Sequence, residues 1–230
     1  MGLFTARDEI TSEVVEFFHF LTGRSLKNNY QHLLIAPVNM FSRFKAMIER
    51  EAEIAKSGKP AQIIAKFNNM EENDIALGLY AASQKGVQID LIVRGFCCMR
   101  PGVPGLSENI RIMSLLGRFL EHSRIYYFRN GAEDPVDGEF YLGSADWMYR
   151  NLHARVEAIT PILDRQLKEK CWEILQICLK DQRQVWDMKS DGSYSQRKGV
   201  EQQGAHAQLM QITKARSKHV EEPTVSGDED

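Results

Sequence analysis

Three short apolar runs alternate with two amphipathic segments between residues 32 and 94, and this alternation limits the chain to few folds. Apolar runs of this length predict strands, and segments with helical periodicity predict helices. Strands are expected at His32–Ala36, Gln62–Asn68 and Val87–Arg94, and helices at Met40–Ser57 and Glu71–Gln84. The pattern is typical of an α/β fold, with a mostly parallel central sheet flanked by helices.

Polar side chains occur where two of these predicted strands end. Lys66 and Asn68 lie near the end of the second strand, and Arg94 ends the third. Ligands of such sheets bind outside the carboxyl ends of the strands. We therefore expect a site at this edge. Both cations could instead pair with an acid across the sheet.

The rest of the chain predicts further elements and a division into three parts. Additional strands are expected at Asn109–Leu115, Arg124–Phe128, Glu139–Leu142 and Arg155–Thr160. Helices are expected at Asp8–Leu21 and Leu163–Leu179, and a short helix or turn at Gly117–His122. Near the C-terminus, a hairpin is expected around Asp191-Gly192 and a small helix at Gln202–Arg216. Residues 1–182 are predicted to form the main domain, and 183–219 a hairpin and helix appendage. Residues 220–230 carry Pro223, Gly227 and a terminal Asp-Glu-Asp, which predicts a disordered acidic tail.

Arginine is concentrated in one stretch of the sequence. Eight of the sixteen arginines fall between Arg94 and Arg155, and this span contains no lysine. The planar guanidinium is the cation that best fits multi-oxygen anions such as phosphates. Because the net charge of the chain is only −2, affinity for a polyanion has to come from such local clustering.

His122 lies in the middle of this cluster. An imidazole can accept a phosphoryl group or move a proton near neutral pH, and arginines can neutralise charge on phosphoryl oxygens. The alternative is a histidine packed between Leu120 and Ile125 with one hydrogen bond. Residues Gly143–Asp146 could bind an anion through backbone N–H groups, or Ser144 or Asp146 could simply cap a helix near Trp147.

Other common sites are not indicated. The sequence has no Walker-type loop and no dinucleotide fingerprint. The four cysteines lack the spacing of a zinc site, so no metal ligands are predicted. Because no signal peptide or membrane-length apolar run is found, a cytoplasmic location is expected.

Several motifs in one register resemble a known family. They are Ile64–Asn69, Gln88–Cys98, Pro101–Arg111, Gly117–Ile125 and Gly143–Leu152, and the opening Gly2–Ala6 fits as well. Together they resemble the C-terminal catalytic region of the large bacterial polyphosphate kinases, over about residues 2–182. The resemblance implies a phospholipase D-like domain. That superfamily's His-x-Lys motif is altered here to His122-Ser123-Arg124.

The resemblance also implies an activity and roles for residues. The family transfers the terminal phosphate of ATP to and from inorganic polyphosphate through a phosphohistidine, with Mg²⁺. By this resemblance Arg94 and His122 contact the nucleotide and the transferring phosphate, with His122 as a proton-handling catalytic residue. Arg155 matches another phosphate-binding arginine, and Lys66 and Arg124 are expected to bind phosphate beside them.

One departure from the family limits these expectations. The histidine that becomes phosphorylated, the Mg²⁺ ligands and a nucleotide-contacting tyrosine lie upstream of the family's Gly-Leu-Phe-Thr motif, with which this chain opens. The expected partners are therefore ATP or ADP, polyphosphate, and the upstream domains or a separate chain that contains them. The full enzyme is expected to be a homo-oligomer that binds no nucleic acid. Its expected location is the cytoplasm, or the periphery of the inner membrane. The alternatives are a binding module without turnover and a phospholipase D-type phosphodiesterase.

Overall fold

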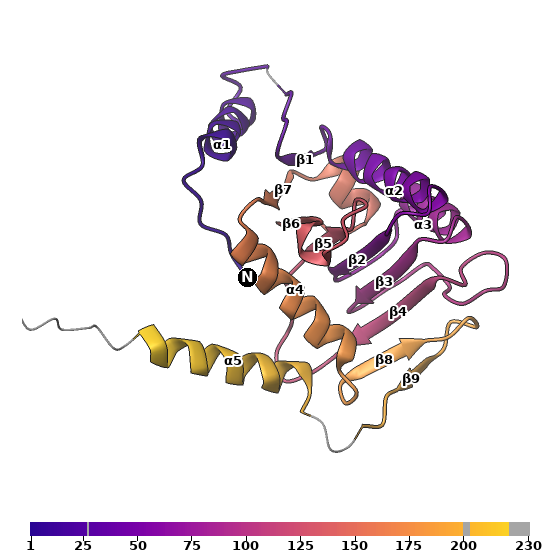
Figure 1. Cartoon of the computed structure of the whole chain (residues 1–230). Helices are drawn as coiled ribbons and strands as arrows, with labels where there is room; N and C mark the ends of the chain where they lie inside the picture. Colours follow the sequence, from indigo (N-terminus) through magenta and orange to yellow (C-terminus); the bar gives the residue numbers. More distant parts are fainter. Residues whose placement is uncertain (27, 200–202, 221–230) are drawn as a thin grey trace, which may run out of the picture.

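A computed structural model describes residues 1–26, 28–199 and 203–220 of the 230-residue chain (Figure 1). The strands are β1 (Leu34–Ala36), β2 (Gln62–Phe67), β3 (Gln88–Val93), β4 (Ile110–Leu115), β5 (Ile125–Phe128), β6 (Glu139–Gly143), β7 (Glu157–Ile162), β8 (Val185–Met188) and β9 (Tyr194–Gln196). The α-helices are α1 (Asp8–Leu21), α2 (Met40–Lys56), α3 (Asn73–Gln84), α4 (Arg165–Lys180) and α5 (Ala205–Val220). Two short helical turns, η1 (Pro135–Asp137) and η2 (Arg150–Ala154), complete the elements.

The nine strands form one mixed sheet in the order β1-β7-β6-β5-β2-β3-β4-β8-β9. The expected α/β fold with flanking helices is confirmed. The expectation of a mostly parallel sheet is corrected, because only β2–β3 and β3–β4 pair in parallel. Parallel neighbours need a long crossover such as α3, whereas β5, β6 and β7 follow one another without an α-helix and therefore pair antiparallel.

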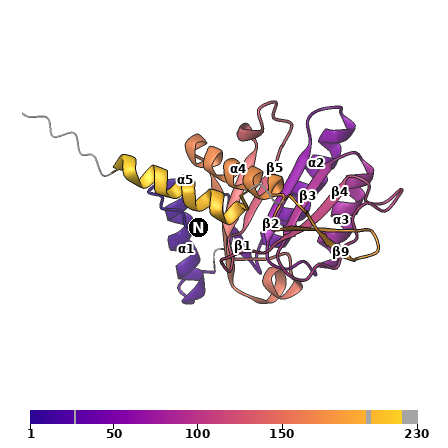
Figure 2. The same ribbon diagram turned by 90° about the horizontal axis from the view of Figure 1, so that it is seen from below.

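Helices cover both faces of the sheet. Figure 2 shows α2 and α3 on one side and α4 on the other. Alternate residues of each inner strand point to opposite faces, so Ile63 and Ala65 of β2 pack under α2 and α3, while Ile64 packs under α4. Both faces are buried, which explains why the inner strands read as nearly continuous apolar runs.

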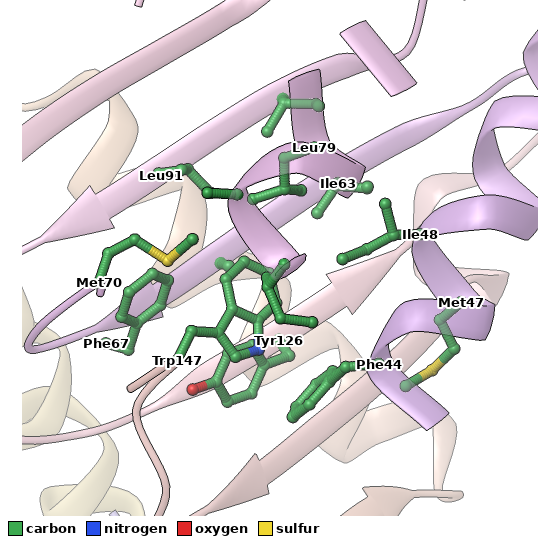
Figure 3. Packing of buried hydrophobic residues seen from close by; sticks show 14 of the residues in the cluster. Phe44, Met47, Ile48, Ile63, Phe67, Met70, Leu79, Leu91, Tyr126 and Trp147 are labelled. Carbon is green, nitrogen blue, oxygen red and sulfur yellow. The ribbon is translucent and has the colours of Figure 1, made fainter. Parts of the chain in front are cut away.

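The core on the α2 and α3 face is centred on aromatic rings. Trp147 is fully buried, and its ring centroid lies 5.1 Å from that of Phe67 and 5.2 Å from that of Tyr126. Figure 3 shows these rings together with Phe44 of α2. Because Trp147 directly follows Asp146, this packing fixes the segment after β6 against the end of β2.

The strand registers bring distant parts of the sequence to one edge of the sheet. Lys66 at the end of β2 pairs with Ile125 at the start of β5, and Ile125 pairs in turn with Leu142 near the end of β6. Gly143 then pairs with Ile159 near the start of β7. Arg94, the segment around His122, Ser144–Asp146 and Arg155 therefore all lie at the edge where β2 and β3 end.

Some local expectations need correction. Residues 117–122 form bends and irregular backbone and no helix. The helical turn after Trp147 is the five-residue π-helix η2, which begins at Arg150. The predicted hairpin is confirmed as β8 and β9, and it pairs with β4 in the same sheet. The small C-terminal helix is α5.

The predicted acidic tail lies almost wholly outside the described residues, because residues 221–230 are not among them. The division of the chain at residues 182 and 219 stays a prediction. In the described part of the chain, no helix is both long and apolar enough to cross a membrane.

Candidate functional site

His122 lies on the irregular segment that joins β4 to β5. Its side chain is exposed, and its imidazole makes no hydrogen bond with any described residue. The alternative of a packed histidine does not fit, because the neighbouring Leu120 is 81% exposed. The residues on either side of His122 are held firmly by two separate polar clusters.

The first cluster joins Lys66 to Glu121 and Ser123. Lys66 is 4% exposed, and its ammonium lies 3.2 Å from a Glu121 carboxylate oxygen. It also donates to the Ser123 backbone carbonyl at 3.2 Å and to the Ser123 hydroxyl at 3.1 Å. The backbone N–H of Ser123 donates to Glu121 at 2.9 Å. Both neighbours of His122 are thus tied to β2.

Electrostatics keep this cluster charged. Burial by itself raises the pKa of Glu121, but attraction to the Lys66 ammonium and hydrogen bonds from Ser123 outweigh it and lower the pKa to about 2. Lys66 points to the α4 side of the sheet, where its charge is compensated by Glu121. Its contact with a phosphate stays a prediction, and in this structure the acceptors around the ammonium belong to Glu121 and Ser123.

The second cluster joins Arg124 to Asp146 and Asn68. Arg124 Nε donates to Asp146 Oδ1 at 2.7 Å, and Arg124 Nη1 donates to the backbone carbonyl of His122 at 3.1 Å. The backbone and side-chain N–H groups of Asn68 donate to the same Asp146 oxygen at 3.0 and 3.1 Å. Asp146 is 4% exposed. Arg124 therefore links the end of β2 to the backbone of His122.

Neither Ser144 nor Asp146 caps a helix, and the alternative of an anion contact through the backbone N–H groups of Gly143–Asp146 stays a prediction. The N–H of Ser144 donates to the Ala158 carbonyl at 3.1 Å, and the N–H of Asp146 donates to Asn151 Oδ1 at 2.9 Å. These two N–H groups are used within the protein, and Asp146 accepts from Asn68 and Arg124 and not from a helix N-terminus. The role of Asp146 as a buried acid that joins two strand ends was not predicted from the sequence. Its partners Asn68 and Arg124 lie 78 and 22 residues away from it in the chain.

Arg94 differs from the other predicted cations. Its backbone is fixed at the end of β3, where its N–H donates to Phe67 O at 3.2 Å and its carbonyl accepts from Ser114 Oγ at 2.9 Å. Its Nη1 atom is buried and has no hydrogen-bond partner among the described residues. An unsatisfied buried donor costs about 1–3 kcal/mol, so an anion that accepts from it would recover this energy.

Arg155 lies just before β7 at the same edge. Its side chain is 56% exposed, and its Nη1 atom lies 3.9 Å from Glu157 Oε1. An exposed pair at this distance is weak, so the guanidinium stays available to solvent and to a ligand.

A cavity of about 850 Å³ opens beside His122. Glu121, His122 and Arg124 line one side of it, together with Leu142–Ser144 and 158–160 from β6 and β7. The other wall is apolar and comes from the first residues of the chain and from Val14, Phe17 and Phe18 of α1. The structure thus brings His122 and Arg124 together in one cavity, whereas Lys66, Arg94 and Arg155 lie outside its lining.

The role of α1 as a cavity wall was not predicted. The periodicity of Asp8–Leu21 indicated an apolar face, but it carried no information on what that face covers. In the structure Phe17 packs against Tyr30, while Phe18 is 59% exposed. The cavity is thus mixed in composition, with polar and charged side chains on one side and apolar ones on the other, which suits a ligand that has both a polar and an apolar part.

The residues around this cavity do not fit Mg²⁺. Both nearby acids, Glu121 and Asp146, already accept from cations and N–H groups of the protein. Across the described ranges, no group of three or more His, Cys, Asp or Glu side chains could hold a metal ion. Burial raises the pKa of the Cys97, Cys171 and Cys178 thiols to about 11, which disfavours the thiolates that would bind a metal.

Comparisons with known proteins agree on one family. A family profile described as polyphosphate kinase C-terminal domain 2 matches residues 33–208. A polyphosphate kinase of Synechocystis is 50% identical over 224 residues, which are 97% of this chain and 30% of the relative. A polyphosphate kinase of Thermosynechococcus vestitus is 50% identical over 216 residues, 93% of this chain and 29% of the relative.

A solved structure gives the same result. The crystal structure of polyphosphate kinase from Porphyromonas gingivalis superposes with a TM-score of 0.87 at 35% identity, over 94% of this chain and 33% of that chain. The chain therefore spans about 30% of the length of these relatives.

Proposed function

The chain belongs to the polyphosphate kinase family, as its C-terminal domain, and on this premise we propose that it supplies one part of the active site for reversible transfer of the terminal phosphate of ATP to inorganic polyphosphate. In the proposed reaction the bond between the terminal phosphorus of ATP and its bridging oxygen breaks, and ADP leaves. The phosphoryl group passes to a histidine supplied from outside this chain, and then to a terminal oxygen of polyphosphate.

The observation that carries this proposal is the placement of His122. Its imidazole is free and exposed to a cavity, while Glu121, Ser123 and Arg124 fix its backbone from both sides. Pre-organised groups of this kind contribute to catalysis because they need no rearrangement during the reaction. We assign to His122 the contact with the transferring phosphate and the movement of its proton.

The cations divide into two groups in this proposal. Arg94 and Arg155 bind phosphate oxygens, because Arg94 has an unpartnered donor and Arg155 is mostly exposed. Lys66 and Arg124 act as positioning residues, because their charges are compensated by Glu121 and Asp146. Arg124 uses its Nε–H and one N–H of Nη1 for hydrogen bonds within the protein. Its other N–H groups remain to face the cavity that it lines.

The proposed partners follow from the same family. They are ATP or ADP, inorganic polyphosphate and Mg²⁺, whose ligands we place mainly outside this chain, together with the upstream domains or a separate chain that contains them. We further propose a homo-oligomer without nucleic acid, in the cytoplasm or peripheral at the inner membrane.

A second candidate is a binding module without turnover. His122 is the single histidine that lines its cavity in the described structure, so the chain offers no second imidazole there to accept a phosphoryl group. In this case the chain would bind a nucleotide or polyphosphate and leave catalysis to another protein.

Labelling with γ-³²P-ATP and Mg²⁺ tests both candidates. The chain alone is expected to gain no acid-labile phosphate, and addition of the upstream domains of a family member is expected to allow transfer to polyphosphate. His122→Ala should abolish that transfer, whereas His19→Ala on α1 should not. Acid-labile phosphate on the isolated chain, or full transfer by His122→Ala, would contradict the proposed roles.

A further inference from the structure

A second cavity, of about 460 Å³, is lined by Arg118 of the segment that bears His122 and shares no lining residue with the first cavity. Its lining residues come from the segment after β4, from the residues just before β8 and from the start of α5 and the two residues before it, and three of them are the exposed cations Arg118, Arg183 and Lys214. No described residue of its lining is acidic. Three like charges without a counter-charge are unfavourable unless an anion joins them.

The acid nearest to Arg183 in the sequence does not neutralise it. Asp181 lies two residues before Arg183, but its carboxylate accepts the backbone N–H groups of Arg183 at 2.6 Å, Gln184 at 2.8 Å and Ala205 at 2.6 Å. Asp181 is 1% exposed, so its charge is used to fix the start of α5. None of Arg118, Arg183 and Lys214 forms an ion pair with another described residue.

His206 adds a buried hydrogen-bond donor to this cavity. It is 4% exposed, and its Nδ1 accepts from the backbone N–H of Phe119 at 3.2 Å. The proton of the neutral ring must therefore be on Nε2. This atom is buried and has no acceptor among the described residues, and the neighbouring Gln184 Oε1 has no donor. A phosphate offers acceptor oxygens and, near neutral pH, also a hydroxyl group.

Another cavity lies between the second cavity and the cavity of His122, as its lining residues show. This third cavity, of about 380 Å³, shares His206, Met210 and Lys214 with the second cavity, and shares Glu121 with the cavity of His122. The three cavities thus follow one another along the segment 117–122. A linear chain of phosphates is similarly extended and repeats the same anionic group along its length.

We infer that Arg118, Arg183, His206 and Lys214 form a second phosphate-binding site, which holds a distal phosphate of an inorganic polyphosphate chain whose end lies at His122. The anionic class of the ligand follows from the cavity itself. The choice of a polyphosphate chain rests on the proposed function.

Calorimetric titration of the intact chain with sodium tripolyphosphate tests the site. Arg183→Gln/Lys214→Gln is expected to weaken binding about tenfold or more, the loss for one or more charge-assisted contacts. The control is the double variant Lys45→Gln/Lys59→Gln, which removes the same charge from two exposed positions, one on α2 and one just after it. It should change the affinity for tripolyphosphate less than about twofold, because it alters only the net charge of the protein, which salt screens. Equal losses in the two double variants would overturn the inference. The four substituted side chains are exposed, so we expect unchanged thermal unfolding.

Histidine ring signals in NMR spectra locate the bound ligand. Tripolyphosphate should shift the signal of His206, and the assignment can be made with His206→Gln. An unmoved His206 signal, or one that moves with ATP but not with tripolyphosphate, overturns the inference. If His206 responds while His122 does not, the second site stands and the proposed role of His122 fails. If His122 responds while His206 does not, the proposed role of His122 is retained and the second site is refuted.

Discussion

The ammonium of Lys66 lies 3.2 Å from the carboxylate of Glu121, the residue that directly precedes His122. This pair ties the segment that carries the candidate catalytic histidine to a central strand of the sheet. On the other side of His122, Arg124 makes the equivalent link through Asp146. His122 is therefore an exposed residue on a segment that is anchored on both sides of it.

Lys66→Met should destabilise the protein by about 3 kcal/mol, because it leaves the Glu121 carboxylate partly buried without its cation. Urea unfolding followed by circular dichroism measures this change. Lys85→Met removes a lysine from its surface pair with Glu53 and should cost clearly less stability, because solvent screens that pair. If both variants lose the same stability, the Lys66 pair is no more than a surface ion pair.

The stabilising effect of Glu121 should depend on pH. Its pKa is about 2 in the folded protein and about 4.3 in an unfolded chain. A lowered pKa gives stability that is present above pH 4.3 and is lost as the pH falls towards 2. We expect Glu121→Gln to cost about 1–2 kcal/mol at pH 6, after allowance for solvent screening.

Thermal unfolding of wild type and Glu121→Gln between pH 7 and pH 2 tests this dependence. The two curves of stability against pH should converge at the acidic end, because wild-type Glu121 becomes neutral there. A gap that stays constant down to pH 2 would show that Glu121 stabilises the fold through packing and not through its charge.

Arg124→Gln should destabilise the protein by about 2–4 kcal/mol, because Asp146 stays buried with neutral donors from Asn68 only. The variant should also loosen His122, since the hydrogen bond to its carbonyl is lost. Urea unfolding and the NMR line width of the His122 ring report these two effects. The control Arg165→Gln affects an exposed pair with Asp134 and should change neither quantity measurably.

Arg94→Gln should lower the affinity for ATP about tenfold or more when the chain is combined with its upstream domains, the loss for a charge-assisted contact. Its stability should hardly change, because Nη1 of Arg94 has no partner in the protein to lose. Equilibrium dialysis with labelled ATP gives the affinity. Unchanged affinity together with reduced stability would return Arg94 to a purely structural role.

Gly143→Ala should destabilise the protein by more than about 2 kcal/mol, because a new methyl group at this position overlaps the Ala158 carbonyl and lies 2.7 Å from Ile159 Cα. These are backbone atoms of β7, which cannot move without breaking the strand pair. Gly78→Ala is the matched control within α3. Its methyl group would lie 3.6 Å from Ile48 Cγ2, and alanine favours helix, so a gain of up to about 1 kcal/mol is expected in thermal unfolding.

Much of the fold could be predicted from local patterns. The bounds of α1 agree with the expected Asp8–Leu21, and β2, β3 and β4 lie within one residue of the expected bounds at each end. These elements depend on the spacing of apolar residues over a few turns or pleats, which is visible in a short window of sequence. The placement of Arg94 at the end of a buried strand was likewise predictable.

The direction of the outer strands was not predictable in this way. β5, β6 and β7 each appear as a short apolar run, and such a run does not state whether its neighbour is parallel or antiparallel. The absence of a helical pattern between these runs was the available signal for antiparallel pairing, and the expectation of a mostly parallel sheet did not use it.

By itself, the sequence determined the alternation of strands and helices, the concentration of arginines around His122 and the resemblance to a family. The tertiary structure alone decided which of these cations are free. Lys66 and Glu121 are 55 residues apart, and Arg124 and Asp146 are 22 apart, so their pairing depends on which strands lie side by side. A charge near the end of a strand looks the same in the sequence whether a carboxylate covers it or not. Burial and long-range register make that difference, since they leave Arg94 with an unpaired donor and enclose Lys66.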